Sequence, residues 1–109
     1  MNLPTRMSRV DIERTLKSRA YRIRSILYSA LIYQLPLTQS SRFTSVVSKK
    51  IARHAVDRNR IKRRTREAVR SVGWSQKPHL VILYPTQGVA RLPFEEIVAD
   101  LQALIKKFP

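Results

Sequence analysis

The chain has 109 residues and carries 22 Lys and Arg against 7 Asp and Glu, which gives a net charge of +15. Its length fits one domain, and 43% hydrophobic residues are enough for a core, while two Gly and no Cys exclude a low-complexity chain, a disulfide scaffold and a thiolate metal site. The charge points to a polyanionic partner, nucleic acid above all, because phosphate neutralisation releases counterions.

The first twenty residues predict a loose leader followed by a short helix. Residues 1–7 show no periodic pattern, and we expect them to be loose. Ser8 with an acid three residues later, Asp11, resembles a capping box. Ile12 and Leu16 stand one helical turn apart, so the pattern predicts a helix over 8–18 with these two side chains on one face.

Three strands are predicted next. Residues 21–23 fit a short edge strand, and residues 26–35 are rich in the β-branched and aromatic side chains that favour strands. Residues 42–47 alternate in polarity after a loop at 36–41. Because the loop is short, we expect the strands at 26–35 and 42–47 to pair antiparallel.

The most basic stretch lies in the middle of the chain. Residues 49–70 hold ten Lys and Arg against Asp57 and Glu67 alone. Apolar and small side chains recur at helical spacing from Ile61 to Val72, so the stretch predicts an amphipathic helix over about 57–72, with Asp57 as its N-cap and Gly73 at its end. Its far side would present Asn59 and a row of arginines.

The last third predicts a central strand and a closing helix. After a loop at 74–78, residues 79–84 form a short continuous apolar run, typical of a strand buried on both faces. Pro93 then opens a helix whose apolar residues recur with a period of three and four, from Phe94 to Phe108. The whole order is α-β-β-β-α-β-α, a single-domain α+β sandwich over residues 1–109.

The central motif resembles that of a known family. Ser48-Lys49-Lys50, Arg58-Asn59-Arg60 with Lys62 and Arg63 following, and then Arg66 resemble the bacterial ribonuclease P protein component. The order of predicted elements is similar over nearly the whole chain. The resemblance implies a ribosomal-protein-like fold with a left-handed β-α-β crossover.

The resemblance also implies a function. The chain would be the small cytoplasmic protein subunit of a ribonucleoprotein, with one protein per RNA, whose catalytic RNA removes the 5′ leader from precursor tRNA. Mg²⁺ would be held mainly by the RNA, and the protein would have no metal site and no active site of its own. The RNA-binding set implied by the motif is Ser48, Lys49, Lys50, Arg58, Asn59, Arg60, Lys62, Arg63 and Arg66.

The family also has a cleft for the single-stranded leader between its first helix and the sheet. Two Phe usually line it, and this sequence has Ile12 and Leu16 at those places. Tyr28, Tyr33 and Phe43 are further candidates to line the cleft, since an aromatic ring offers a stacking surface to an unpaired base.

Three other functions are less well supported. A self-contained nuclease would need carboxylates gathered around metals, and the seven acids are scattered. A membrane-surface role would need a broad apolar helix face, and no apolar run approaches the ~20 residues that span a bilayer. A ribosomal or general RNA-chaperone protein stays open, because fold alone does not separate it from a ribonuclease P subunit.

Overall fold

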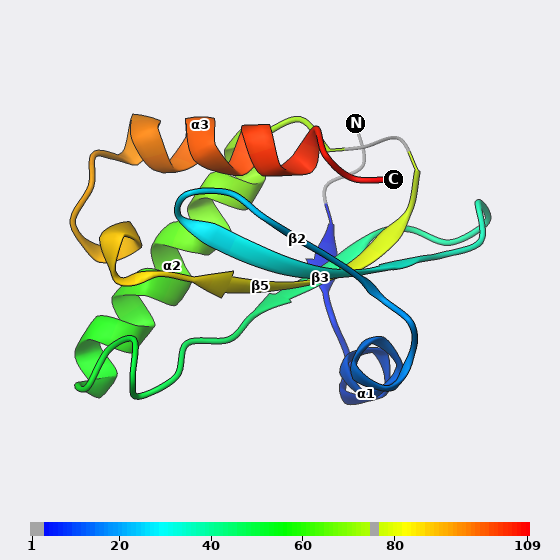
Figure 1. Cartoon of the computed structure of the whole chain (residues 1–109), viewed down its shortest axis with the longest axis horizontal. Helices are drawn as coiled ribbons and strands as arrows, with labels where there is room; N and C mark the ends of the chain where they lie inside the picture. The colour runs from blue at the N-terminus through cyan, green and yellow to red at the C-terminus, as the bar shows by residue number, and fades with distance from the viewer. Residues whose placement is uncertain (1–3, 75–76) are drawn as a thin grey trace.

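The computed structural model describes residues 4–74 and 77–109 and shows a sheet with helices on both faces (Figure 1). The elements in chain order are β1 (Thr5–Arg6), α1 (Arg9–Lys17), β2 (Tyr21–Arg24), β3 (Tyr28–Gln34), β4 (Arg42–Ser45), α2 (Ala55–Ser71), β5 (His79–Pro85), the 3-10 helix η1 (Gln87–Ala90) and α3 (Phe94–Ile105). The predicted α-β-β-β-α-β-α order is confirmed, with β1 and η1 in addition. Of the predicted loop at 74–78, residues 75 and 76 lie outside the described residues.

The five strands follow the order β1-β4-β5-β3-β2. The expected antiparallel pair of β3 and β4 is therefore wrong, because β5 lies between them. Val81 of β5 pairs with Ile32 of β3 in an antiparallel ladder and with Phe43 of β4 in a parallel one. The physical reason is burial: β5 is apolar along most of its length, so it gains most at the centre of the sheet. The parallel β4–α2–β5 unit implied by the resemblance is present.

The two faces of the sheet are covered by different helices. α2 and α3 pack on one face, where Ile32 of β3 joins Ile61, Leu101 and Leu104 in the larger core cluster. α1 lies on the opposite face, over a smaller cluster that includes Leu31 and Ile82 (Figure 1). The alternation of side chains along β3 and β5 supplies both clusters.

The N-terminal segment differs from the prediction of a loose leader. Residues 5 and 6 form an edge strand parallel to β4, in which the Thr5 amide donates to Ser41 O at 3.2 Å. The Met7 amide donates to Phe43 O at 3.0 Å, and the Met7 side chain is buried. Two residues are too few for an alternating pattern, so the strand left no periodic signal in the sequence.

Helix α3 begins after Pro93, as predicted, and holds two connections in place. Asp100 accepts hydrogen bonds from the Ser25 hydroxyl at 2.6 Å and the Leu27 amide at 3.0 Å, which ties down the turn between β2 and β3. Gln102 exchanges two hydrogen bonds with the backbone of Gly73. Gly73 does not take the left-handed conformation expected of a helix-ending glycine, because α2 ends at Ser71 with an extended Val72. No helix among the described residues is long and apolar enough to cross a membrane.

Candidate nucleic-acid interface

Helix α2 is seated on the core by one narrow stripe. Ile61, Thr65, Ala68 and Val69 are buried, as their helical spacing predicts. Thr65 is the polar member, and its hydroxyl lies 3.1 Å from the buried hydroxyl of Tyr28. Both hydroxyls thus have a hydrogen-bond partner. The buried stripe and this hydrogen bond fix which side of α2 faces the core, and the opposite side faces solvent.

The helix begins two residues earlier than predicted. His54 occupies the N-cap position without a side-chain hydrogen bond, so the prediction of Asp57 as N-cap is wrong. Asp57 instead stands in the first turn, where its negative charge still complements the helix dipole. The chain enters the helix through a turn in which the Ile51 and Ala52 amides both donate to Ser48 O at 3.1 Å.

Two arginines of α2 donate hydrogen bonds to backbone carbonyls of the protein itself. The Nη1 of Arg58 donates to Ala52 O at 3.0 Å and Arg53 O at 2.9 Å, so this side chain pins the entry turn to the helix. Arg64 reaches the opposite way, to Val89 O at 3.0 Å and Leu92 O at 2.6 Å, and anchors η1. The sequence alone does not show that these two arginines are structural and their neighbours exposed, because that difference depends on which backbone carbonyls the fold brings near each side chain.

The rest of the predicted RNA-binding set lies at the surface. Asn59, Arg60, Arg63 and Arg66 are exposed, and Lys62 is half-buried. Ser48, Lys49 and Lys50 are exposed in the turn before the helix. The structure therefore brings the predicted set together on and beside α2. Within this set, Arg58 holds the turn before the helix through its hydrogen bonds to backbone carbonyls.

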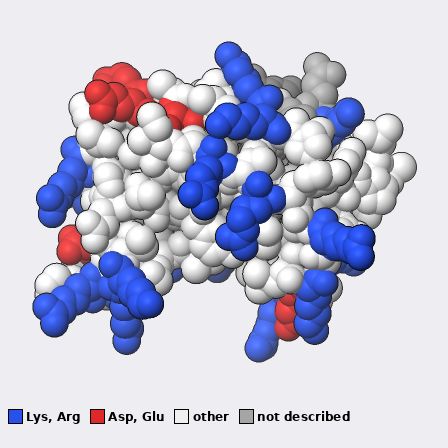
Figure 2. Space-filling model, in the orientation of Figure 1, with Lys and Arg blue, Asp and Glu red and all other residues white. Residues whose placement is uncertain are grey.

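Basic side chains are unevenly distributed over the molecule. In Figure 2, Lys and Arg gather at the lower left, where α2 begins in Figure 1, while acidic side chains gather at the upper left, where α3 begins. The first turn of α3 contains two acidic residues, Glu95 and Glu96. A polyanion would be attracted to the start of α2 and repelled from the start of α3.

The five residues predicted to line a leader cleft do not share one face. Ile12 and Tyr33 are half-buried around the α1-side cluster, and Leu16 on α1 is 57% exposed. Tyr28 is fully buried on the α2 side, and Phe43 packs at the edge of that same core. On the α1 face, only Ile12, Leu16 and Tyr33 remain as candidates; Tyr28 serves packing.

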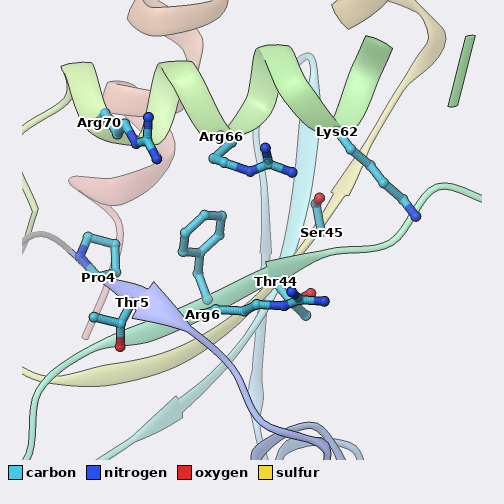
Figure 3. A pocket seen from close by; sticks show the side chains of 9 residues that line it. Pro4, Thr5, Arg6, Thr44, Ser45, Lys62, Arg66 and Arg70 are labelled. Carbon is cyan, nitrogen blue, oxygen red and sulfur yellow. The ribbon is translucent and has the colours of Figure 1, made fainter. Parts of the chain in front are cut away.

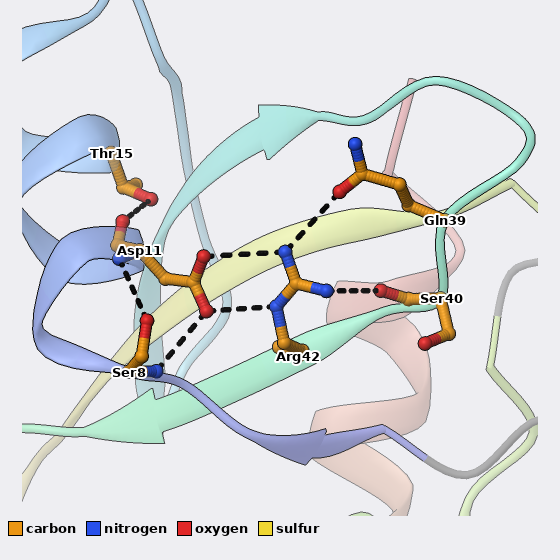
Figure 4. Close-up of polar contacts among 6 residues, drawn as sticks. All are labelled: Ser8, Asp11, Thr15, Gln39, Ser40 and Arg42. Carbon is orange, nitrogen blue, oxygen red and sulfur yellow. Dashed lines mark hydrogen bonds and ion pairs between the residues drawn. The ribbon is translucent and has the colours of Figure 1, made fainter.

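A charged pair fixes α1 against the sheet (Figure 4). Arg42 of β4 donates to Asp11 through Nε at 2.8 Å and Nη2 at 3.2 Å. Asp11 also completes the predicted capping box, because its carboxylate accepts from the Ser8 amide and its own amide donates to the Ser8 hydroxyl. Burial alone would raise the pKa of Asp11, but the hydrogen bonds from Arg42 and Ser8 and the charge of Arg42 leave it below its usual value.

The two histidines lie in different environments. His79 is fully buried at the start of β5, where burial lowers its pKa despite a hydrogen bond with Pro109 O. His54 is exposed at the start of α2. Within residues 4–74 and 77–109, no three His, Asp or Glu side chains come close enough to hold a metal ion.

Comparison with known proteins gives one family and one fold. The Ribonuclease P family profile matches residues 8–109. The structure of the RNase P protein from Thermotoga maritima superposes with a TM-score of 0.77 at 22% identity, covering 95% of this chain and 97% of that one. The RNase P protein from Staphylococcus aureus gives a TM-score of 0.70 at 22% identity, covering 92% and 90%. A further T. maritima structure, in complex with 1-(4-fluorophenyl)-2-thiourea, gives 0.75 at 22%, covering 94% and 100%.

Proposed function

Since this chain belongs to the ribonuclease P protein family and is the protein subunit that works with the ribonuclease P RNA in tRNA processing, we propose that it supports an RNA-catalysed reaction and supplies no active site itself. The substrate is the 5′ leader junction of precursor tRNA, and the site of action is the cytoplasm. The alternative, a ribosomal or RNA-chaperone protein, has no observation in its favour.

The observation that carries this proposal is the contrast between the two sides of α2. One side of the helix is buried in the core, and the other presents exposed Asn59, Arg60, Arg63 and Arg66 beside the basic turn at 48–50. Arginine grips phosphate through two parallel donors, so a row of them on a rigid helix suits a folded RNA backbone. We expect this surface to bind the catalytic RNA with one protein per RNA.

Mg²⁺ belongs to the RNA in this proposal. Two of the acids already have partners in the protein: Asp11 is paired with Arg42, and Asp100 accepts hydrogen bonds from the hydroxyl and amides of the β2–β3 turn. The protein's own contribution is to neutralise phosphates, which lowers the Mg²⁺ concentration that the folded RNA requires.

Reconstitution tests the proposal directly. The purified protein is added to the ribonuclease P RNA of the same genome and to precursor tRNA at a low Mg²⁺ concentration at which the RNA alone is inactive. We expect the leader to be removed only when both components are present. Cleavage by nuclease-free protein without RNA would contradict the proposal, and so would an RNA whose activity the protein leaves unchanged.

A pair of neighbouring arginines provides a matched control. Arg63→Ala removes an exposed side chain and is expected to weaken RNA binding at an unchanged melting temperature, with the log–log salt slope flattened by about 0.7–0.9 for each phosphate that the variant no longer neutralises. Arg64→Ala removes the same charge but leaves Val89 O and Leu92 O without their donor, so it is expected to destabilise the fold by about 1–3 kcal/mol. Unchanged affinity and slope in Arg63→Ala would remove this residue from the interface.

A further inference from the structure

A pocket of about 510 Å³ opens between α2 and the edge of the sheet. The described residues that line it are Pro4, Thr5, Arg6, Phe43, Thr44, Ser45, Lys62, Arg66 and Arg70. Figure 3 shows Arg6 reaching from β1 and Lys62, Arg66 and Arg70 descending from α2 around the same space. Its volume lies within the range of small-molecule sites, which is about 300–1,000 Å³.

The cations around the pocket are not neutralised by the protein. None of the described lining residues carries a carboxylate. Among the described residues, the side chains of Arg6, Lys62, Arg66 and Arg70 have no hydrogen bond or ion pair, in contrast to the occupied Arg58 and Arg64. Four positive charges facing one hollow repel one another, and an anion bound between them would relieve the repulsion.

The three helix cations form a regular line. Lys62, Arg66 and Arg70 stand at successive intervals of four residues on one side of α2, so the line extends for roughly 12 Å at 1.5 Å per residue. Arg6 faces this line from the sheet, because it pairs with Phe43 in the parallel ladder and so projects from the same face. A row of this length matches a strand with several phosphates better than a single inorganic anion.

The pocket also has an aromatic wall that is held in place. Phe43 is half-buried, and its ring centroid lies 6.5 Å from that of Trp74, which lies in turn 6.0 Å from that of Phe108. The Trp74 indole donates to Val69 O at 3.0 Å, so the aromatic chain is fixed to α2. Such a ring loses little entropy when a base stacks on it, and the Ser45 hydroxyl beside it supplies a polar contact for a sugar or phosphate oxygen.

We propose that this pocket binds an unpaired nucleotide of an RNA strand, with the flanking phosphates on Arg6, Lys62, Arg66 and Arg70 and the base against Phe43. The proposal rests on the proposed function, but it extends the contact region from the outward face of α2 to the edge of the sheet, with Arg66 shared between the two. An unpaired nucleotide is required because a base held in a duplex presents its ring faces to its neighbours, where Phe43 has no access.

Two variants separate this pocket from the rest of the helix. The double change Arg6→Ala, Arg70→Ala removes two pocket cations outside the family motif, and Phe43→Leu removes the ring but keeps an apolar side chain. Phe43→Tyr keeps the ring and serves as the rescue variant. Lys106→Ala changes an exposed residue at the C-cap of α3 that does not line the pocket, and it is the control for charge. Arg60→Ala reports on the outward face of α2.

Each variant is titrated against the ribonuclease P RNA alone, and each holoenzyme is then titrated against precursor tRNA. The double variant is expected to weaken one of these two affinities with a flatter salt slope, and Phe43→Leu to weaken the same one about fivefold or more while Phe43→Tyr restores it. A weaker affinity in the first titration assigns the strand to the catalytic RNA, and a weaker affinity in the second assigns it to the substrate. Melting temperatures are measured in parallel, and Arg6→Ala, Arg70→Ala should not lower the value, because neither side chain has a partner among the described residues.

Two outcomes would overturn the inference in distinguishable ways. If Arg60→Ala weakens RNA binding while both pocket variants equal Lys106→Ala in each titration, the proposed function stands and the pocket carries no nucleotide. If Arg60→Ala, the double variant and Phe43→Leu all leave both affinities unchanged, the RNA-binding function of α2 fails together with the pocket.

Discussion

At the scale of single residues, the arginines divide by what they contact rather than by where they fall in the sequence. Arg42, Arg58 and Arg64 direct their donors to a carboxylate or to backbone carbonyls of the protein. Arg63 and Arg66, one or two positions away from Arg64, have no such contact among the described residues and are exposed. The structure assigns Arg58 and Arg64 to stability, and the proposed function leaves their exposed neighbours in the same basic run for RNA binding.

The Asp11–Arg42 pair should contribute to stability in a way that depends on pH. Asp11→Asn is expected to lower the free energy of unfolding at pH 7 by about 1–3 kcal/mol, because it weakens two charge-assisted hydrogen bonds to a half-buried guanidinium. The folded-state pKa of Asp11 is lowered, so its contribution is full above the unfolded value of 3.8 and disappears as the pH falls through the folded value. The difference between wild type and variant should thus shrink below about pH 4 in thermal melts.

The matched control is Glu13→Gln on the same helix. Glu13 forms a long ion pair with Arg9, 3.9 Å at best, with both side chains largely in solvent. Exposed pairs of this kind contribute little, so the melting temperature should hardly change. Equal effects of Asp11→Asn and Glu13→Gln would show that the Arg42 contact does not fix α1.

At the scale of elements, α1 is the helix that buries the fewest side chains in the core. Its buried members are Asp11 and Thr15, both polar, and Ile12 is only half-buried, while Val10 and Leu16 are 64% and 57% exposed. A helix held by a capping box and a charged pair does not need a wide apolar face. That leaves the exposed Leu16 side chain free to contact a ligand, and we propose that this ligand is the leader strand.

Leu16→Phe tests that role with little risk to the fold. Since Leu16 is mostly exposed, a larger ring costs little packing energy, whereas Ile12→Phe would overpack the α1-side cluster by about 1–3 kcal/mol. We expect Leu16→Phe to strengthen holoenzyme binding of leader-bearing precursor tRNA more than binding of mature tRNA, up to about tenfold through one stacked base. An unchanged affinity ratio at an unchanged melting temperature would remove Leu16 from the leader path.

Elements also show where sequence reasoning succeeds and fails. The capping box at Ser8, the stripe from Ile61 to Val69 and the helix after Pro93 are local patterns, and each follows from the spacing of side chains. The pairing of strands is not local. Whether β3 adjoins β4 depends on the position of β5 in the sheet, and β5 begins at His79, 34 residues after the end of β4 at Ser45. The proposed RNA-binding set comes from the sequence motif, whereas the pocket has no signal in the sequence, because Arg6 and Arg70 are brought together only by the fold.

At the scale of the whole molecule, the charge of +15 is carried by a single compact body with a radius of gyration of 13.1 Å. The 7 Asp and Glu are too few to neutralise the 22 Lys and Arg, even though Arg42 pairs with Asp11 and Arg9 with Glu13. Mutual repulsion among the remainder opposes the compact state. The free protein should accordingly be less stable than the protein bound to a polyanion.

Pyrophosphate, used as a probe, should reveal this stabilisation by a bound anion. At concentrations up to about 10 mM it is expected to raise the melting temperature by several degrees, because an anion that binds only the folded state stabilises it by mass action. Sodium chloride at the same ionic strength is the control, since it screens charge without binding at a defined site. Equal melting curves in the two salts would show that charge repulsion alone, without anion binding, sets the stability.

The central place of β5 has a consequence for how the chain folds as it is made. β3 and β4 both take β5 as a neighbour, and β5 begins only at His79, after all of α2. While the ribosome is still adding residues before it, the nascent chain can form the β2–β3 hairpin but not the sheet, and α2 still lacks η1 and α3, on which it packs. Synthesis from the N-terminus therefore delivers the most basic helix of the protein before the strand that completes the sheet beneath it, so the sheet is completed late.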